Sequence, residues 1–309
     1  MKRRTLLKTL GALSVAPAVL PAAAAAATAP RSAKPVLRLA HITDVHLKGE
    51  LNAPEKFVRC LEHIHQQSPK VDLVLNGGDT VFDMNKEQLP TIEAEWKLWH
   101  SIIEAHCHIP MKHCLGNHDI WWYEEGTKGD PAYGKQYSLK QLKMEAPWYT
   151  FNQAGWQFIV LDSVHLDIDN TWYIGKLGDA QYTWLEQQLA QLPATTPVCI
   201  LSHIPLLTAT LMIEDNIVNR WEFTGGDMHT DIAKLTKLFV QHPNVKLCLS
   251  GHIHIRDKVV YNNVTYICDG AVSGAWWNGN RRETPPGYGL IDLYADGTFD
   301  EQYVPYLER

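Results

Sequence analysis

The amino-acid sequence predicts a protein of the α/β (α+β) class, in which two β-sheets pack as a β-sandwich flanked by helices. Short apolar runs end repeatedly in polar loops that contain glycine, helical patterns lie between several of these runs, and hairpin-like runs follow toward the C-terminus. A composition of 45% apolar and 20% charged residues excludes a disordered chain. Six cysteines in 309 residues exclude a disulfide scaffold.

Five apolar runs have the length of buried strands, and each is followed by a polar loop. We expect these strands at Val36–Ile42, Val71–Leu75, Ile109–Leu115, Val198–Leu201 and Val245–Leu249. Further strands are expected at Trp148–Phe151, Trp156–Leu161, Lys258–Ile267 and Gly289–Tyr294, with turn signals within or after them. Trp172 and Tyr173 fall in a polar insertion.

Apolar residues at helical spacing predict helices between the strands. The pattern at Pro54–Gln67 places Phe57, Leu61 and Ile64 on one face. Similar patterns occur at Leu89–Ala105, Asp179–Leu192 and Asp231–Gln241. Because no linker rich in Pro, Gly or Ser divides residues 31–309, we interpret them as a single domain.

Residues 1–30 have the pattern of an export signal. A basic start containing Arg3 and Arg4 is followed by a weakly apolar stretch and a run of alanines. Arg3-Arg4-x-Leu-Leu-Lys resembles the twin-arginine signal peptide, which implies export to the periplasm by the Tat translocation machinery. Pro17, Pro21 and the low hydrophobicity of alanine argue against stable membrane insertion.

The charge of the remaining chain is acidic. Residues 31–309 hold 24 basic and 34 acidic side chains, a formal net charge of −10. This average field repels a polyanion, and basic clusters are lacking, so we expect no nucleic-acid polymer as partner. A small anionic substrate must instead be attracted locally, for example by bound metal cations.

Side chains that commonly bind metals follow five of the predicted strands. They are Asp44 and His46, Asp79, Asn117 and His118, His203, and His252 and His254. Loops at the carboxyl ends of strands are where α/β proteins gather their active sites. A mixed set of imidazoles and carboxylates suits Zn²⁺, Mn²⁺ or Fe better than Ca²⁺ or Mg²⁺. The set is too large for one metal with open positions, so we expect two metals that share an aspartate.

These blocks, in this order, resemble the signature of the calcineurin-like metallophosphoesterases. The blocks are Asp44-x-His46, Gly78-Asp79, Gly116-Asn117-His118-Asp119, His203 and Gly251-His252-x-His254, and they extend over about residues 36–255. The resemblance implies a β-sandwich flanked by helices, with a dinuclear metal centre in the loops at the strand ends.

The resemblance also implies a role for each residue. One metal would be held by Asp44, His46 and His254, the other by Asn117, His203 and His252, and Asp79 would bridge them. His118 would lie beside the phosphate as an acid or electrostatic partner. We expect Asp119, the next residue, to orient the His118 ring.

Two adjacent metal cations would support the mechanism of a phosphoesterase. They lower the pKa of a bridging water, which yields hydroxide near neutral pH for in-line attack, and they neutralise the phosphoryl oxygens. Protonated His118 would give its proton to the leaving alkoxide. Because only Asp44 and Asp79 are anionic ligands, the centre stays net positive and captures phosphate in spite of the acidic surface.

Single residues indicate which branch of the family the chain resembles. Purple acid phosphatases carry a metal-binding tyrosine three residues after the bridging aspartate, where this chain has Phe82. Only 55 residues follow His254, too few for the additional C-terminal domain of exported nucleotidases. The spacing is closer to the compact branch that includes bacterial cyclic-nucleotide phosphodiesterases, and Asp83 matches an acidic position often seen there.

Aromatic and basic residues near the ligand blocks are candidates for substrate binding. We expect Trp121, Trp122, Trp276 and Trp277 to form a wall for a base, sugar or lipid portion, and Arg281 or Arg282 to bind a second phosphate. The alternative is that the tryptophans pack in the core. Neighbouring Gly, Asn and Arg residues indicate loops, where large aromatics often contact ligands.

The leading hypothesis is therefore a periplasmic metal-dependent phosphoesterase that hydrolyses a small-molecule phosphate ester. A phosphodiester, such as a nucleotide or related small molecule, is favoured over a phosphomonoester. A second hypothesis is an enzyme acting on phospholipid head groups or other phosphodiesters of the cell envelope. A non-catalytic binding protein on this fold is the remaining alternative, although every expected ligand is retained.

Overall fold

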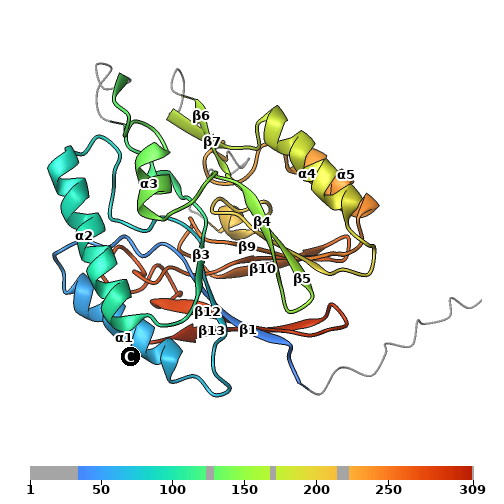
Figure 1. The fold of residues 1–309 in the computed structure, drawn as a ribbon, viewed down its shortest axis with the longest axis horizontal. Coiled ribbons are helices and arrows are strands. Elements are labelled where there is room, and N and C mark those ends of the chain that lie inside the picture. The colour runs from blue at the N-terminus through green and yellow to red at the C-terminus, as the bar shows by residue number, and fades with distance from the viewer. Residues whose placement is uncertain (1–33, 123–128, 168–171, 214–222, 308–309) are drawn as a thin grey trace, which may run out of the picture. The chain divides into compact units, whose positions relative to one another are not determined.

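The computed structural model describes residues 34–122, 129–167, 172–213 and 223–307, and it contains two large sheets (Figure 1). In the first sheet β1 (Leu37–Ile42), β2 (Leu73–Asn76) and β3 (Met111–His113) run parallel. β12 (Gly287–Leu293) pairs antiparallel with β1, and β13 (Phe299–Pro305) antiparallel with β12. The order is β13-β12-β1-β2-β3.

The second sheet has the order β10-β11-β9-β8-β5-β4. Its central strands run parallel and comprise β5 (Trp156–Val160), β8 (Val198–Leu201), β9 (Val245–Ser250) and β11 (Val264–Cys268). Its edge strands are antiparallel to their neighbours and comprise β4 (Tyr149–Gln153) and β10 (Asp257–Tyr261). Parallel strands in both sheets place several carboxyl ends at one edge of each sheet.

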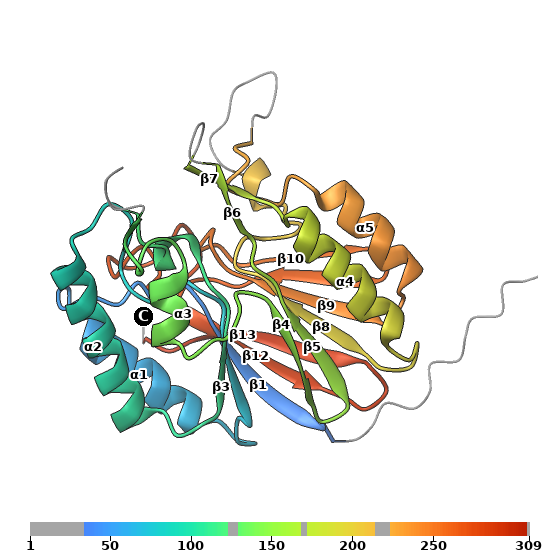
Figure 2. The same ribbon diagram turned by 45° about the horizontal axis from the view of Figure 1, so that its top comes forward.

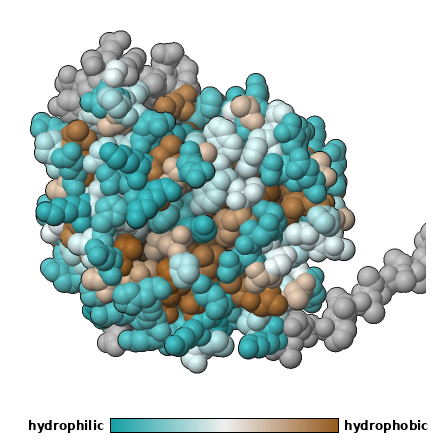
Figure 3. Space-filling model, in the orientation of Figure 1, coloured by the Kyte–Doolittle hydropathy of each residue, from teal (hydrophilic) through white to brown (hydrophobic). Residues whose placement is uncertain are grey.

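The core between the sheets is apolar because strand residues alternate between the two faces. Leu39 of β1 points into this core with Phe158 of β5 and Leu249 of β9, whereas Ala40 belongs to the cluster on the opposite face of the first sheet. Hydrophilic residues cover most of the molecular face seen in Figure 3. The two sheets are joined by burial of apolar surface and by a few polar contacts, such as the hydrogen bond from the Tyr149 hydroxyl of β4 to the His113 carbonyl of β3 at 2.8 Å.

Helices cover the outer faces of both sheets (Figure 2). α1 (Ala53–His65) and α2 (Leu89–His106) pack on the first sheet, and α4 (Asp179–Gln191) and α5 (Ile232–Gln241) on the second. The expected apolar stripe of α1, with Phe57 and Leu61, is buried, and Phe57 stacks on Trp99 of α2. α3 (Gln136–Gln141) is a short additional helix. The predicted class, a two-sheet sandwich flanked by helices, is confirmed.

Two elements differ from the sequence prediction, and one predicted turn is confirmed. Trp172 and Tyr173, expected in a polar insertion, begin β7 (Trp172–Gly175), which pairs with β6 (Val164–Asp167) in a separate hairpin. The turn signal at Asn262 and Asn263 within Lys258–Ile267 is confirmed, because both residues lie in the left-handed region and join β10 to β11. β13 was not expected, because its residues are largely polar and its outer edge is unpaired.

Residues Ser32–Arg309 form one compact unit. The predicted signal peptide, residues 1–30, lies outside the described residues. Among the residues that the structure describes, none of the helices has the length and apolar character needed to span a membrane.

Glu95 of α2 generates a prediction about stability and pH. Burial raises the pKa of this carboxyl to about 8, although its Oε2 accepts a hydrogen bond from the Phe82 amide at 3.2 Å. The folded state thus retains the proton above an unfolded pKa of 4.5, and the free energy of unfolding falls as pH rises toward 8.

The Glu95→Gln variant keeps an acceptor oxygen without the charge. Between pH 5 and pH 9, we expect the free energy of unfolding of the parent protein to fall by at least about 1 kcal/mol more than that of the variant. Urea denaturation at both pH values measures this. Glu93→Gln, on the exposed face of the same helix, is the matched control. Equal pH dependence in all three proteins would contradict the prediction.

Candidate metal centre

All eight expected ligand-type residues lie in loops that follow parallel strands. Asp44 and His46 follow β1, Asp79 follows β2, Asn117 and His118 follow β3, His203 follows β8, and His252 and His254 follow β9. The two sheets thereby contribute their loops to one end of the sandwich. Residues far apart in the chain, such as His46 and His254 at a separation of 208 positions, become direct neighbours.

The backbone of these loops is strained. Five of the residues, namely Asp44, His46, Asp79, His252 and His254, have φ between 44° and 73°, in the left-handed region that residues with a side chain rarely adopt. Hydrogen bonds between loops maintain these conformations. The Asp44 amide donates to the Gly78 carbonyl at 3.0 Å, and the His46 amide to the Asp79 carbonyl at 2.9 Å. Strain that the surrounding structure holds in place is typical of functional sites.

Two loop glycines are required because side chains of the site occupy the space beside them. A Cβ on Gly116 would overlap Asp79, and a Cβ on Gly251 would overlap Thr43 and Asp44. The glycines of the Gly-Asn-His-Asp and Gly-His-x-His blocks therefore let neighbouring loops approach closely.

The first cluster of potential ligand atoms contains Asp44, His46 and His254, all of them buried. Nε2 of His254 lies 3.1 Å from Nε2 of His46 and 3.3 Å from Oδ1 of Asp44. Nε2 of His46 also lies 3.5 Å from Oδ2 of Asp79. These are the residues that sequence resemblance assigned to one metal.

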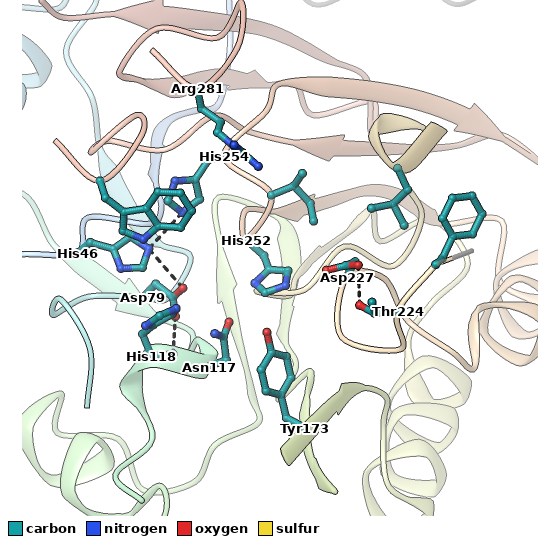
Figure 4. A pocket seen from close by; sticks show the side chains of 14 residues that line it. His46, Asp79, Asn117, His118, Tyr173, Thr224, Asp227, His252, His254 and Arg281 are labelled. Atoms are coloured by element: carbon teal, nitrogen blue, oxygen red, sulfur yellow. Dashed lines mark hydrogen bonds and ion pairs between the residues drawn. The ribbon is translucent and has the colours of Figure 1, made fainter. Parts of the chain in front are cut away.

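The second cluster contains Asp79, His203 and His252. Nε2 of His203 lies 3.3 Å from Oδ2 of Asp79 and 3.1 Å from Oδ1 of Asn117. The same Asp79 oxygen therefore lies near a histidine of each cluster, as a bridging ligand must. Figure 4 shows Asp79 beside His46, with Asn117 and His252 on the other side.

Hydrogen bonds determine which nitrogen each imidazole presents. Nδ1 donates to a backbone carbonyl in His46, His203 and His254, with Phe82, Gly77 and Gly274 as the respective acceptors. A carbonyl can only accept, so Nδ1 carries the hydrogen and Nε2 is left as the ligand atom. The two Nε2 lone pairs of His46 and His254 then face each other at 3.1 Å. This donor set fits a cation placed between them.

The protonation equilibria agree with a cation site. Burial lowers the pKa of both His46 and His252 to about 3, so both rings are neutral and able to bind metal. Burial alone would also lower the pKa of His203, but the Asp79 carboxylate outweighs it and raises that pKa to about 9. A metal ion held by Nε2 of His203 and Oδ2 of Asp79, which lie 3.3 Å apart, would take the place of that proton.

His118 differs from the other histidines of the site. Its Nδ1 lies 3.1 Å from Oδ1 of Asp83, and its ring centroid lies 4.8 Å from that of His46. Burial opposes protonation, but the carboxylates of Asp79 and Asp83 outweigh it and raise the His118 pKa to about 9. A protonated, half-exposed imidazole beside the ligand clusters is suited to donate a proton rather than to bind metal.

The expected role of Asp119 requires a correction. Its carboxylate accepts hydrogen bonds from the Thr80 and Gly116 amides, both at 2.9 Å, and is fully buried. Asp119 therefore holds the Asp79 loop against the Asn117 loop. Asp83 is the carboxylate that contacts the His118 ring, because the chain after Asp79 returns toward His118, with the Met84 amide donating to the His118 carbonyl at 3.0 Å.

A cavity of about 440 Å³ opens over the ligand clusters. Of the six expected substrate-binding residues, Trp276 and Arg281 line it. The Trp276 ring lies 4.4 Å from the His254 ring, and the Arg281 guanidinium lies 5.9 Å from the Trp276 ring (centroid distances). Figure 4 shows the Arg281 side chain extending toward the cavity.

The other four residues do not line the cavity, which corrects the expected wall of four tryptophans. Trp121 and Trp277 are each 4% exposed and belong to the core beside α1 and α2. The Trp121 indole donates to the Glu87 carbonyl and the Trp277 indole to the His46 carbonyl. Trp122 packs near Lys86, and Arg282 is exposed outside the cavity. Adjacent residues in these loops point in opposite directions, so only one tryptophan of the Trp276–Trp277 pair reaches the cavity.

Sequence reasoning missed a second wall of the cavity. It comprises Tyr173 of β7 together with Leu211, Phe223, Thr224, Asp227 and Ile253. Apart from Ile253, which lies between His252 and His254, these residues lie outside the ligand blocks, in segments that carry no motif. Tyr173 and Asp227 are far apart in the chain, and no sequence pattern indicates that they are neighbours in the fold.

The chain belongs to the calcineurin-like phosphoesterase family. The sequence profile of that family matches residues 37–256, which include every ligand block. The fold and the site residues of the chain agree with this membership. The protein is a hydrolase acting on phosphoric ester bonds.

Two relatives are similar over most of their length. The chain is 26% identical to a 3',5'-cyclic-nucleotide phosphodiesterase of Nostoc sp., over 87% of this chain and 93% of the relative. It is 25% identical to the 3',5'-cyclic adenosine monophosphate phosphodiesterase CpdA of Haemophilus influenzae, over 86% and 88%. A dimetal phosphatase from Danio rerio shares the fold, with a TM-score of 0.66, 13% identity and coverage of 89% and 98%.

Asp79→Asn provides a test of the two clusters. We expect this change to weaken metal binding in both clusters by more than about 10-fold, because it removes the shared negative charge. His254→Ala should weaken one cluster only and leave about one metal per chain. Elemental analysis after dialysis measures the metal content. Asp179→Asn, an exposed change on α4, is the control and should bind metal like the parent protein. Two retained metals in Asp79→Asn would contradict the assignment.

The Asp83–His118 contact predicts a change in pH dependence. Removing the carboxylate in Asp83→Asn lowers the His118 pKa, so the imidazole loses its proton at a lower pH. We expect the fall of kcat/KM at high pH to begin at lower pH in the metal-loaded variant. Asp119→Asn should instead reduce stability without this displacement. A displaced profile in Asp119→Asn alone would restore the sequence-based assignment.

Proposed function

We propose that this protein is a dinuclear metal-dependent phosphodiesterase that acts on a small molecule such as a cyclic nucleotide. The observation that carries the proposal is the position of Asp79 Oδ2, 3.5 Å from Nε2 of His46 and 3.3 Å from Nε2 of His203. One carboxylate oxygen thereby lies close to a histidine of each of the two clusters. Zn²⁺, Mn²⁺ and Fe ions suit this donor set.

Bound metal ions would supply an activated water and positive charge for the phosphoryl oxygens. The chain holds the ligand atoms in place beforehand, through Nδ1 hydrogen bonds of three histidines to backbone carbonyls. Asp44 is fixed in the same way, because the His252 amide donates to its Oδ2 at 2.9 Å. Such preorganisation limits the rearrangement needed during the reaction.

His118 completes the site as proton donor to the leaving oxygen. Asp83 is paired with Nδ1, which leaves Nε2 as the ring atom that can transfer a proton. Trp276 offers an apolar surface next to His254, and Arg281 offers a cation within the same cavity. These two residues would contact the organic portion and a phosphate oxygen of the substrate.

A phosphodiester is favoured because both bacterial relatives described above are cyclic-nucleotide phosphodiesterases. The phosphomonoesterase alternative stays open, since the same metal chemistry hydrolyses both ester types. The chain also retains every expected ligand and His118, which disfavours a purely binding role.

The proposal is tested with bis(p-nitrophenyl) phosphate, p-nitrophenyl phosphate and cyclic AMP. We expect the metal-loaded protein to hydrolyse the diesters, a chelator to abolish turnover, and His118→Ala to lower kcat by about 10²- to 10⁴-fold. His108→Ala, at an exposed histidine that does not line the cavity, is the matched control.

The ratio of diester to monoester turnover decides between the two substrate types. Hydrolysis that survives both the chelator and His118→Ala would overturn the mechanism. Two bound metals without turnover of any ester would overturn the proposed substrate range.

A further inference from the structure

The cavity continues beyond the ligand clusters to a wall that the metal chemistry does not use. In Figure 4 Asp227 and Thr224 lie across the pocket from His46 and His118, with His252 and Tyr173 between them. Leu211, Phe223 and Ile253 complete this side of the cavity. We call Tyr173, Leu211, Phe223, Thr224 and Asp227 the distal wall.

The Asp227 carboxylate is held in a defined orientation. The Thr224 hydroxyl donates to Asp227 Oδ2 at 2.5 Å, and the Asp227 amide donates to the Thr224 carbonyl at 3.3 Å. These two bonds close a turn over residues 224–227. The hydroxyl thus occupies Oδ2, and among the described residues no hydrogen bond is made to Oδ1. Within the described parts of the chain, Asp227 forms no ion pair with a lysine, arginine or histidine.

The turn is attached to the hairpin that carries Tyr173. The Gly175 amide of β7 donates to the Gly225 carbonyl at 2.7 Å, and the Thr230 amide donates to the Gly175 carbonyl at 2.8 Å. The hairpin packs in turn on Ile120 and Ile204, which lie directly after the Asn117–Asp119 and His203 segments. The distal wall is therefore built on the loops that carry the site.

The two ends of the cavity differ in the charge that they present. Cations held by the ligand clusters would make one end positive, whereas the Asp227 carboxylate makes the other end negative, next to the apolar Leu211 and Phe223. A ligand that fits both ends carries a phosphate at one end and a hydrogen-bond donor at the other. A second phosphate near Asp227 would be repelled.

We propose that the distal wall binds the organic group esterified to the phosphate and that Asp227 selects groups carrying an O–H or N–H donor while rejecting a second phosphate. This inference rests on the proposed phosphodiesterase function. It differs from the sequence-based expectation that Arg281 or Arg282 binds a second phosphate. A nucleoside and an alkylammonium alcohol share the required chemistry, and both are small enough for the cavity.

Two variants separate the charge of Asp227 from its hydrogen bonding. Asp227→Ala should raise KM for a donor-bearing diester about tenfold with little change in kcat, because a ligand loses a hydrogen bond to a charged group. Cyclic AMP and glycerophosphoethanolamine are the two probes, and the one whose KM rises identifies which organic group the distal wall binds. Bis(p-nitrophenyl) phosphate, whose leaving group has no donor, should keep its KM and shows that the variant is folded.

Asp227→Asn removes the negative charge and keeps an acceptor. The dinucleoside monophosphate ApA and its 5'-phosphorylated form pApA differ by one phosphate only. The parent protein should hydrolyse ApA with a kcat/KM at least about tenfold above that for pApA, and Asp227→Asn should reduce this preference. Asp179→Asn serves as a control for the loss of one charge outside the cavity.

The outcomes distinguish this inference from the proposed function. Unchanged KM values in Asp227→Ala together with an unchanged ApA preference in Asp227→Asn would overturn the subsite. Turnover of bis(p-nitrophenyl) phosphate alone by the parent protein would overturn it too, and would leave the phosphodiesterase function standing. Failure of the parent protein to hydrolyse any diester would instead overturn the function itself.

Discussion

The site depends on one constraint, the placement of the Asp79 carboxylate between histidines that come from two different sheets. His46 follows a strand of the first sheet and His203 a strand of the second, and Asp79 Oδ2 lies within 3.5 Å of an Nε2 atom in each. Such closeness of acceptor atoms is unfavourable without a cation or a proton between them. The apolar core between the sheets supplies the free energy that holds them together.

The backbone of the site residues is likewise held in conformations that these residues do not prefer by themselves. Left-handed φ values at Asp44, His46 and Asp79 oppose the intrinsic tendency of residues with side chains. Amide-to-carbonyl bonds between loops and the buried Asp119 carboxylate maintain these conformations. Asp119 therefore contributes to the chemistry through the shape of the backbone, whereas Asp83 contributes through direct contact with His118.

The structure brings together the histidines and carboxylates that sequence reasoning selected as candidate ligands. Histidines and carboxylates placed directly after buried strands can be recognised one block at a time, and the parallel topology brings the blocks together. Roles that depend on the direction in which a side chain points were predicted poorly. Trp276 and Trp277 have the same local sequence context, yet one lines the cavity and the other donates a hydrogen bond within the core.

The sequence by itself determined the fold class, the order of the strands along the chain and the candidate ligand residues, because periodicity and strand-end position are local properties. Tertiary structure alone decided which carboxylate faces His118, which tryptophan reaches the cavity, and that Tyr173 and Asp227 form its distal wall. The physical reason is that a side chain's direction and its contacts depend on how loops from distant parts of the chain pack against one another. A single sequence carries no separate signal for such packing.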